Sequence, residues 1–313
     1  PDGSRVIWSN GADRMSKIDA DTFEVLAELP RADKVLVTSA EADANIALLD
    51  QQTGAELAST GLGLGATYLL GLTGIYYALD SDNTMFIGGE DSVLAYQDEI
   101  AGDPHSPIVL RNEWKRPTEI TGGFVGVNMT FDGKLVVVTD EGWIVVLERD
   151  FSDYVAIALP GQEVAAAHNA EVVANGITLA SASWVRNSIA VDDQGGIYAV
   201  SFDEIHKVMW DGVKLSISPD DGAWSVPYSN GNGKGSGATP ALMGYCDDRF
   251  VVVTDGDAQM NVMLFWRDAI PQDWENIEGQ TDPRVAGNAL VTMDDAKLTA
   301  IQSEQGVVVG GYG

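Results

Sequence analysis

Short runs of alternating apolar and polar residues recur along the chain, and turn residues separate them. In segment 128–150, NMTFDGKLVVVTDEGWIVVLERD, a first run is followed by an Asp-Gly turn, a second run, an acidic glycine turn and a third run. Alternation among β-branched and aromatic residues is typical of strands, and Asp-Gly accepts the positive φ of a tight hairpin. The segment is therefore predicted to be an antiparallel meander.

The same order of runs and turns repeats. Two close copies are found at 187–212 and 239–268 and two looser ones at 1–30 and 75–98, and 304–313 resembles the opening of one more. Repeated meanders are typical of the blades of a β-propeller, which leaves only short, protected strand edges. We predict an all-β fold in which residues 1–313 form a single β-propeller domain of about six blades, each a four-stranded antiparallel meander.

Loop or helical insertions interrupt the repeat near residues 31–60, 160–184, 215–238 and 266–290. In the first, Thr38 and Glu41 have the spacing of a capping box ahead of apolar positions, which predicts a short helix. In the third, the stretch 223–239 is rich in glycine, serine and asparagine, which predicts a mobile loop. Long loops on a rigid scaffold are where binding residues gather.

The strong negative charge of the chain limits the kinds of molecule that it is expected to bind. The chain has 47 acidic against 18 basic residues, a formal net charge of −29. Such a surface repels phosphate backbones, so we expect no nucleic acid partner. It fits an extracellular or periplasmic setting, where salt screens self-repulsion, and it equally fits a cation-binding protein. Residue 1 already lies in a turn that feeds a strand, so the start of the gene product, any signal peptide included, is expected to be missing from the sequence.

Other features have structural explanations. The single Cys246 excludes an intrachain disulfide framework, and no apolar run is long enough for a membrane span. Acidic pairs at turns, such as Asp192-Asp193, are expected to stabilise Asx-type geometry. Four tryptophans lie near the insertions, at positions Trp184, Trp224, Trp266 and Trp274. Packing between blades is expected of them, with an aromatic rim around a ligand as the alternative.

When the repeats are aligned by their turns, four polar residues stand at the predicted starts of innermost strands: Asn128, Asn187, Thr239 and Glu304. The first strand of each propeller blade lines the central channel, so these side chains are predicted to meet at one channel mouth. Asparagine and glutamate oxygens are hard ligands suited to Ca²⁺ or Mg²⁺. The alternative is that Asn and Thr satisfy local backbone groups through Asx-type turns and hold no ligand.

The blade opening, Asn-x-small-x-apolar followed by Asp-x-x-Gly and Ile-Tyr-x-Val, resembles the senescence-marker-protein/gluconolactonase group and the related strictosidine-synthase-like and paraoxonase-like propellers. The resemblance covers blade signatures over about half the chain. It implies a divalent cation, commonly Ca²⁺, that polarises a lactone or ester carbonyl. By position, Asn128 and Asn187 match the family's asparagines and Glu304 its glutamate. Thr239 stands where the family has an aspartate that is both ligand and base.

The chain has three histidines, and one of them is a candidate for proton transfer. His168, in the insertion before the Asn187 strand, is the candidate proton carrier, because an imidazole beside a cation-held carbonyl can act as acid or base. His105 lies in a turn and is expected to be solvated. His206 lies in a predicted third strand and is expected to be a surface or packing residue.

The leading functional hypothesis is a metal-dependent hydrolase of a small lactone or ester, acting at the mouth of the channel. A Ca²⁺-like ion held by Asn128, Asn187 and Glu304 would be its Lewis acid. One alternative is a non-catalytic propeller that binds a protein partner or a small ligand. Another is a quinoprotein-type oxidoreductase, because ATPALMGYCDDRFVVVTDGDA resembles blades of such propellers.

Overall fold

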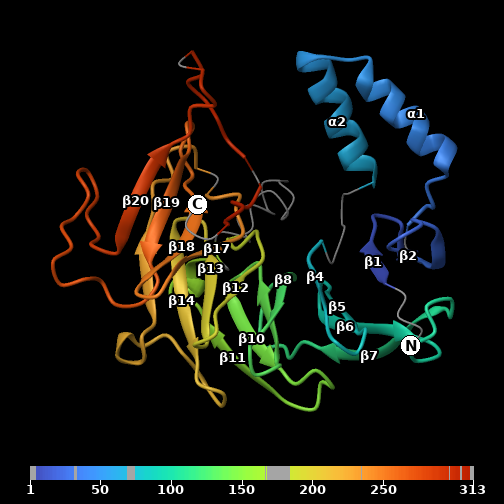
Figure 1. Cartoon of the computed structure of the whole chain (residues 1–313), viewed down its shortest axis with the longest axis horizontal. Helices are drawn as coiled ribbons and strands as arrows, with labels where there is room; N and C mark the ends of the chain where they lie inside the picture. The colour runs from blue at the N-terminus through green and yellow to red at the C-terminus, as the bar shows by residue number, and fades with distance from the viewer. Residues whose placement is uncertain are drawn as a thin grey trace. The chain divides into compact units, whose positions relative to one another are not determined.

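The computed structural model describes residues 5–31, 34–68, 75–165, 167, 184–233, 235–295, 297–303 and 305–310. The chain divides into two compact units (Figure 1). Unit 1 comprises Pro1–Ile87 and Val93–Trp114, and unit 2 comprises Gly88–Ser92 and Lys115–Gly313.

Unit 1 is built on two antiparallel sheets. Their strands are β1 (Val6–Asn10), β2 (Arg14–Asp19) and β3 (Val25–Pro30) in the first, and β4 (Tyr77–Leu79), β5 (Met85–Gly88), β6 (Ser92–Asp98) and β7 (Ile108–Lys115) in the second. A core that includes Trp8 and Met15 from the first sheet and Met85 from the second joins them. Lys17 is also buried in this core, and its Nζ lies 2.6 Å from Asp98 Oδ1.

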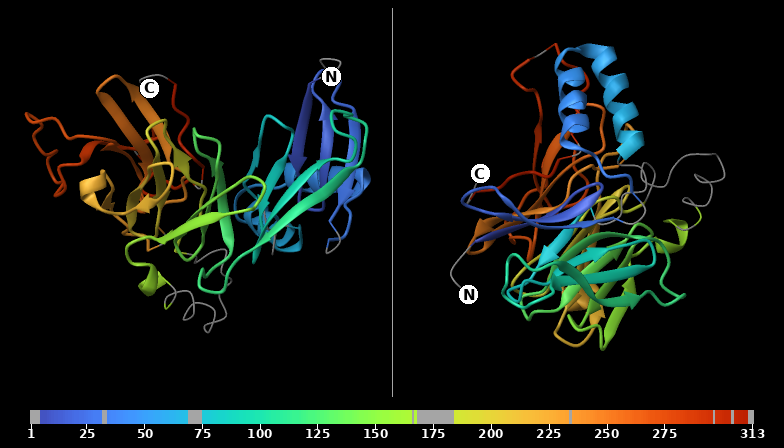
Figure 2. Two further views of the ribbon diagram at one scale, coloured as in Figure 1. Left: turned by 90° about the horizontal axis from the view of Figure 1, so that it is seen from below. Right: turned by 90° about the vertical axis from the view of Figure 1, so that its right-hand side faces the viewer.

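Two helices lie between β3 and β4, namely α1 (Ser39–Asp50) and α2 (Gly54–Tyr68), which run side by side as a hairpin (Figure 2). The Thr38 hydroxyl accepts a hydrogen bond from the Glu41 N–H at the start of α1, and the Glu41 carboxylate accepts one from the Thr38 N–H. The predicted capping box is therefore confirmed. None of the residues described in either helix is buried. No helix of the described residues is long and apolar enough to cross a membrane.

Unit 2 carries three successive antiparallel sheets. The first has β8 (Phe124–Met129), β9 (Leu135–Thr139), β10 (Trp143–Leu147) and β11 (Tyr154–Ala158). The second has β12 (Ala190–Val191), β13 (Gly196–Val200), β14 (Glu204–Trp210) and β15 (Leu215–Ser216), with β16 (Trp224–Pro227) also paired to β14. The third has β17 (Ala241–Tyr245), β18 (Asp248–Thr254), β19 (Asn261–Trp266) and β20 (Val285–Leu290).

The fold is an all-β propeller, as predicted. Apart from β16, the strands of each sheet follow one another in chain order as antiparallel neighbours, which is the meander of a propeller blade. The described residues form five such sheets, and two depart from the four-strand pattern. The β1–β3 sheet has three strands, and the β12–β16 sheet has five because β16 pairs with β14 on the side of β15.

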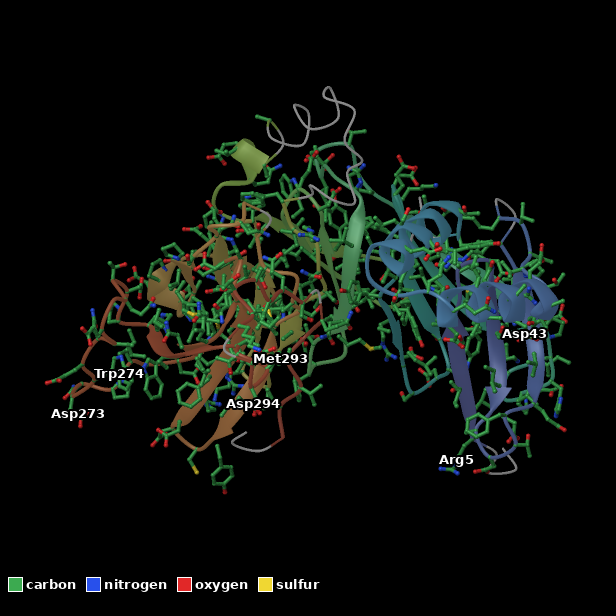
Figure 3. The ribbon with its side chains drawn as sticks, turned by 90° about the horizontal axis from the view of Figure 1, so that it is seen from above. Arg5, Asp43, Asp273, Trp274, Met293 and Asp294 are labelled. Atoms are coloured by element: carbon green, nitrogen blue, oxygen red, sulfur yellow. The ribbon has the colours of Figure 1, made fainter. Side chains whose placement is uncertain are left out.

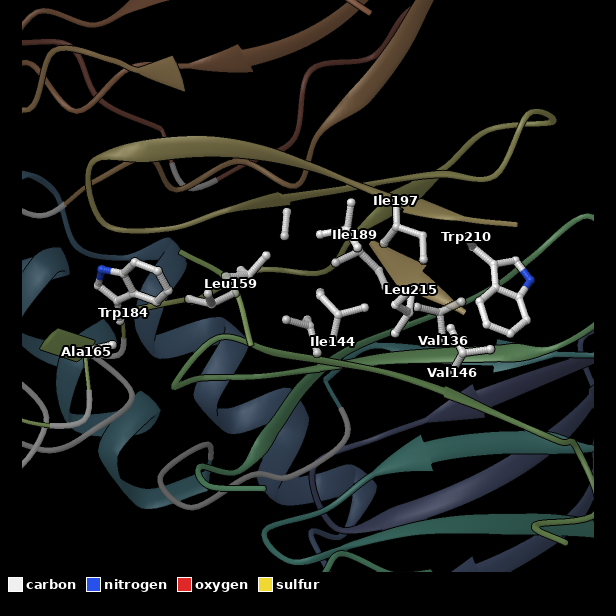
Figure 4. Close-up of a cluster of buried hydrophobic side chains, with 14 residues drawn as sticks. Val136, Ile144, Val146, Leu159, Ala165, Trp184, Ile189, Ile197, Trp210 and Leu215 are labelled. Carbon is white, nitrogen blue, oxygen red and sulfur yellow. The ribbon is translucent and has the colours of Figure 1, made fainter. Parts of the chain in front are cut away.

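Apolar side chains fill the space between successive sheets of unit 2. Ile144 and Val146 of the first sheet pack with Ile197 of the second, and Trp184 extends this core (Figure 4). A Cβ on Gly142 would lie 2.4 Å from the Trp184 ring, and Gly142 has φ +87°. Only glycine allows both that backbone conformation and the close approach of the ring. Packing between blades is therefore confirmed for Trp184.

The predicted mobile loop at 223–239 is wrong. Trp224–Pro227 forms β16, and Ala238 is fully buried. Tyr228 fixes the next segment, because its hydroxyl donates to the Ser201 carbonyl and accepts from the Ser236 N–H. Glycine and serine are present here because the backbone packs closely, since a Cβ on Gly235 would lie 2.8 Å from a backbone oxygen.

Candidate functional site

Asn128 lies near the end of an innermost strand, whereas a position at its start was predicted. It is the fifth of the six residues of β8, and the turn to β9 begins at Thr130. Its Nδ2 donates to the Ile189 carbonyl at 2.9 Å, and its Oδ1 accepts from the Met129 N–H at 2.8 Å. The predicted strand-start position is therefore wrong for Asn128, whose amide connects two backbone segments.

Asn187 lies at a different level on the neighbouring innermost strand. It is buried, it precedes β12, and its Nδ2 donates to the Ser236 carbonyl at 3.3 Å. The next residue, Ser188, exchanges hydrogen bonds with the backbone of Val127 through its Oγ. Asn187 therefore lies beyond Val127, on the side away from Asn128, and the two asparagines are offset along adjacent strands.

Thr239 is half-buried and precedes β17. A Cβ on Gly306 would lie 3.4 Å from the Thr239 carbonyl oxygen, so the segment 305–310 passes beside it. The other two predicted site residues, Glu304 and His168, lie outside the described residues.

The metal site stays a prediction. In the part of the chain that the structure describes, no group of three or more His, Cys, Asp or Glu side chains is placed to hold one ion. The ligand roles of Asn128, Asn187 and Glu304, and the catalytic roles of His168 and Thr239, have no test in this geometry. The observed amide hydrogen bonds correspond to the alternative in which these polar side chains satisfy backbone groups.

Acidic residues at the hairpin turns behave as expected. Asp192, at the turn between β12 and β13, is buried, and its Oδ1 accepts from the N–H groups of Gln194 and Gly196. Asp211 does the same for Val213 and Lys214 at the turn after β14. The Asx-type interpretation of these carboxylates is confirmed.

A second set of acidic turns was predicted between the second and third runs of each repeat, but the sequence analysis gave these turns no role. These turns join the second and third strands of four successive sheets and contain Glu90 and Asp91, Asp140 and Glu141, Asp203 and Glu204, and Asp255 and Asp257. All four belong to unit 2. We call the surface formed by these turns the acidic face. The signal was present in the sequence, as a recurring acidic pair after the second strand of each copy.

Backbone contacts connect the first three acidic turns. The Phe124 N–H donates to the Gly89 carbonyl at 2.9 Å, which joins the first turn to the start of β8. The Asp140 carbonyl in the second turn accepts from the Val185 N–H at 2.9 Å. Val185 in turn pairs with Ser201, which leads into the third turn. These turns are therefore neighbours on one surface.

The segment after β16 connects the third acidic turn to the fourth. The Tyr228 N–H donates to the Asp203 carbonyl at 3.1 Å. Beside it, the Ser229 hydroxyl and the Gly231 N–H both donate to Asp257 Oδ1 at 2.7 Å. In this way each acidic turn is held in place by an ordered segment next to it.

Burial and mutual repulsion act on the carboxylates of the acidic face. Burial raises the pKa of Asp255, against the effect of hydrogen bonds from Asn261. Burial, together with the charge of Asp203, also raises the pKa of Glu204. Asp203 itself is exposed, as are Glu90 and Asp91 in the first turn. The face therefore presents fixed negative charge at its surface.

The chain was compared with known proteins. No protein-family model matches it. It is 35% identical over 247 residues to an uncharacterized protein of Archaeoglobus fulgidus. The match covers 77% of this chain and 43% of the relative, so the chain spans less than half of the relative's length.

Several solved structures are similar to the chain at low identity. BamB from Moraxella catarrhalis is 12% identical with a TM-score of 0.38, over 62% of this chain and 45% of that one. AztD from Citrobacter koseri is 14% identical with a TM-score of 0.37, again over 62% and 45%. A Bacteroides caccae protein of unknown function is 12% identical with a TM-score of 0.43, over 96% and 76%.

Proposed function

We propose that the chain is a non-catalytic binding propeller whose acidic face takes a positively charged segment of a protein partner. The observation that carries the proposal is the recurrence of carboxylates at the same turn of four successive sheets. Negative charges at fixed positions make the electrostatic potential at the surface more negative, so they attract positively charged groups. This attraction speeds association and favours partners of complementary charge.

The spread of the carboxylates favours a protein partner with several positive charges. Glu90, Glu141, Asp203 and Asp257 come from four different turns, so one small cation would not meet them all. A lysine- or arginine-rich segment carries charges at intervals and can reach several turns together. The net charge of −29 disfavours a nucleic acid in the same place.

The test is the affinity for an oligolysine peptide, measured by calorimetry at low and at physiological salt. Glu90→Gln, Glu141→Gln and Asp203→Asn, combined in one variant, should raise Kd about tenfold, because each exposed charge pair contributes up to about 1 kcal/mol. The difference should shrink at the higher salt, since exposed charges are screened.

The matched control removes the same charge from other turns of unit 2. Asp153→Asn, Asp220→Asn and Asp247→Asn lie outside the four acidic turns, and all three residues are exposed. This variant should keep the affinity of the wild type within about twofold. An equal loss in both triple variants would show that only net charge matters, and the acidic face would then not be the site.

The hydrolase prediction has its own test on the same preparations. Turnover of a lactone or ester that depends on Ca²⁺ and is lost in Asn187→Ala would contradict the non-catalytic part of the proposal. Metal content and activity with a panel of small lactones are therefore measured beside peptide binding.

A further inference from the structure

A pocket of about 190 Å³ opens in unit 2 where the β8–β11 sheet meets the β12–β16 sheet. The first sheet lines it with the end of β10 and the start of β11, and the second with Trp210, Gly212 and Val213. Trp210 and Trp184 lie at opposite ends of the core between these sheets (Figure 4). The Trp184 ring contacts the β9–β10 turn, which belongs to the acidic face. The pocket is therefore at the other end of the strands from the acidic face.

Three charged residues stand opposite one another at the ends of β9, β10 and β11. They are Lys134, Glu148 and Asp153, each one position beyond the last pairs of the strand register. The Glu148 N–H donates to the Asp153 carbonyl at 3.0 Å, and Lys134 Nζ donates to Glu148 Oε1. Residues directly opposite on neighbouring strands point to the same face, so the three side chains form a row across the sheet.

This row lies on the face of the first sheet that meets the second. Val136, Val146 and Val155 are two positions inward along the same three strands, and they pack in the core that includes Trp210. Side chains two positions apart along a strand share a face. The charged row therefore forms the rim of the pocket, and Val146 and Val155, which line it, form an apolar floor.

The rim has an excess of negative charge. Lys134 pairs with Glu148, and no cation among the described residues pairs with Asp153, which is exposed. Asp132 accepts from Trp210 Nε1 at 3.0 Å, so a third carboxylate lies beside the lining. Three carboxylates thus stand against one cation at this end of the two sheets.

Two other cations follow lining residues in the sequence but do not line the pocket. Arg149 comes directly before Asp150 in the chain. Lys214 is exposed, and its Nζ lies 3.8 Å from Asp221 Oδ2. The wall of the pocket therefore remains acidic.

Carboxylates above an apolar floor fit an alkylammonium group. An ammonium has three hydrogen-bond donors, so it can be shared between Asp153 and Glu148 while its alkyl chain contacts the valines. The volume suits a ligand of about six to eight non-hydrogen atoms, since a cavity of about 150 Å³ holds benzene. The same carboxylates would repel an anion.

We propose that this pocket binds a small free primary amine, with its ammonium group at Asp153 and Glu148 and its alkyl chain on the valine floor beside Trp210. No carboxylate of the acidic face takes part. The site therefore stands or falls independently of the proposed function.

NMR titration with n-butylamine tests the site at neutral pH, where a primary amine is protonated. The reporter is the indole N–H resonance of Trp210, assigned with Trp210→Phe, and sodium chloride keeps the ionic strength constant. The resonance should shift saturably, with Kd below about 20 mM. n-Butanol, which has the same chain without the charge, should bind at least about fivefold more weakly.

Charge variants of the rim should change the affinity in opposite directions. Asp153→Asn should raise Kd for n-butylamine about fivefold, because it removes the carboxylate that no lysine or arginine pairs with. Lys134→Gln should lower Kd about threefold, because it frees Glu148 for the ligand. Asp247→Asn, at an exposed turn of another sheet, is the matched control and should keep Kd unchanged.

Circular dichroism checks the folding of each variant. If Lys134→Gln does not fold, Asp153→Asn decides, because its side chain is exposed and easily replaced. The absence of a saturable shift in the wild type, equal Kd for wild type and Asp153→Asn, or equal Kd for amine and alcohol would overturn the proposal. Displacement of n-butylamine by oligolysine would also overturn it, since the pocket would then receive a lysine side chain of a partner. Unchanged n-butylamine binding in the triple variant of the acidic face would support a separate site.

Discussion

His206 shows how a polar side chain is accommodated inside unit 2. It is 1% exposed, and its ring nitrogens lie 2.8 Å from Ser225 Oγ and 2.9 Å from Ser201 Oγ. The Trp184 ring lies 5.7 Å away. Two hydroxyls can give one acceptor and one donor to a neutral imidazole, and burial lowers the pKa of His206 to about 3. The packing interpretation of this residue is confirmed.

The depressed pKa predicts how stability depends on pH. The ordinary pKa of histidine is 6.5, so between pH 6.5 and about 3 the unfolded chain binds the proton and the folded one does not. Stability should therefore fall as pH drops below 6.5, by up to about 1.4 kcal/mol per pH unit from this residue. Urea unfolding of His206→Gln from about pH 4 to about pH 8 should show a shallower fall. His105→Gln, in an exposed turn, is the control and should keep the wild-type slope.

For single residues, the sequence indicated that polar side chains occur on the innermost strands, but it did not predict where along the strands they lie. Asn128 and Asn187 were aligned because each precedes an acidic glycine turn, yet Asn128 is five positions before Gly133 and Asn187 is eight before Gly195. An odd difference in a strand reverses the face and shifts the level of a side chain. A single sequence does not show how many residues lie in the turn and how many in the strand before it. The level of Asn128 and Asn187 along their strands could therefore not be predicted.

At the scale of elements, α1 depends on its own local interactions. No residue of the helix is buried, so tertiary packing contributes little to its stability. The Thr38 hydroxyl accepts from the Glu41 N–H, and Glu41 accepts from the Thr38 N–H at 2.8 Å. This reciprocal pair satisfies two backbone donors that the first turn would otherwise leave open.

Removing the cap should therefore loosen α1 selectively. Thr38→Ala should destabilise the helix by about 1 kcal/mol and speed amide hydrogen exchange across α1 about fivefold. Exchange in the β8–β20 strands should not change. Thr60→Ala, within α2 and away from any cap, is the control for α1. Unchanged exchange in α1 of the Thr38 variant would show that something other than the cap holds this helix.

Strands and helices were predicted correctly where a short stretch of sequence is enough to determine the secondary structure. Alternation and Asp-Gly turns gave the meanders, and the capping box gave α1. The segment 223–239 was predicted as a mobile loop because its composition is that of a loop. The pairing of Trp224–Pro227 with β14 and the burial of Tyr228 depend on tertiary contacts, which composition does not show. The long connection between β19 and β20 was predicted, and Asp273 and Trp274 lie on it (Figure 3). The Trp274 ring packs edge-on to the Trp266 ring, with 5.2 Å between the ring centroids.

On the scale of unit 2 as a whole, polar side chains join the innermost strands of successive sheets. Asn128 bonds to Ile189 across the first junction, and Ser188 bonds to Val127 beside it. A Cβ on Gly126 would lie 2.7 Å from Ser188 Cα, so the strands approach as closely as backbones allow. The meander order of strands followed from the sequence, and the described residues form five sheets where about six blades were predicted. The junctions did not follow from it, because they depend on register between distant segments.

The junction predicts a structural role for Asn128. Asn128→Ala removes the donor to Ile189 and should lower the free energy of unfolding by about 1 to 2 kcal/mol. Urea unfolding measures this loss, with Asn288→Ala on an exposed strand position as the control. The loss should be the same with and without EDTA. A loss that disappears when EDTA is present would instead assign the asparagine to a metal site.

The hydrogen-bonded junctions between successive sheets determine which part of unit 2 unfolds first. The middle sheet of unit 2 shares one core with the sheet before it and another with the sheet after it, so stability is transmitted by nearest-neighbour coupling along the three sheets. Loosening one junction uncouples the two sheets that share it and leaves a remote sheet with its own core. Partial opening, and not collapse of all three sheets, is then the first response of unit 2 to damage at one boundary.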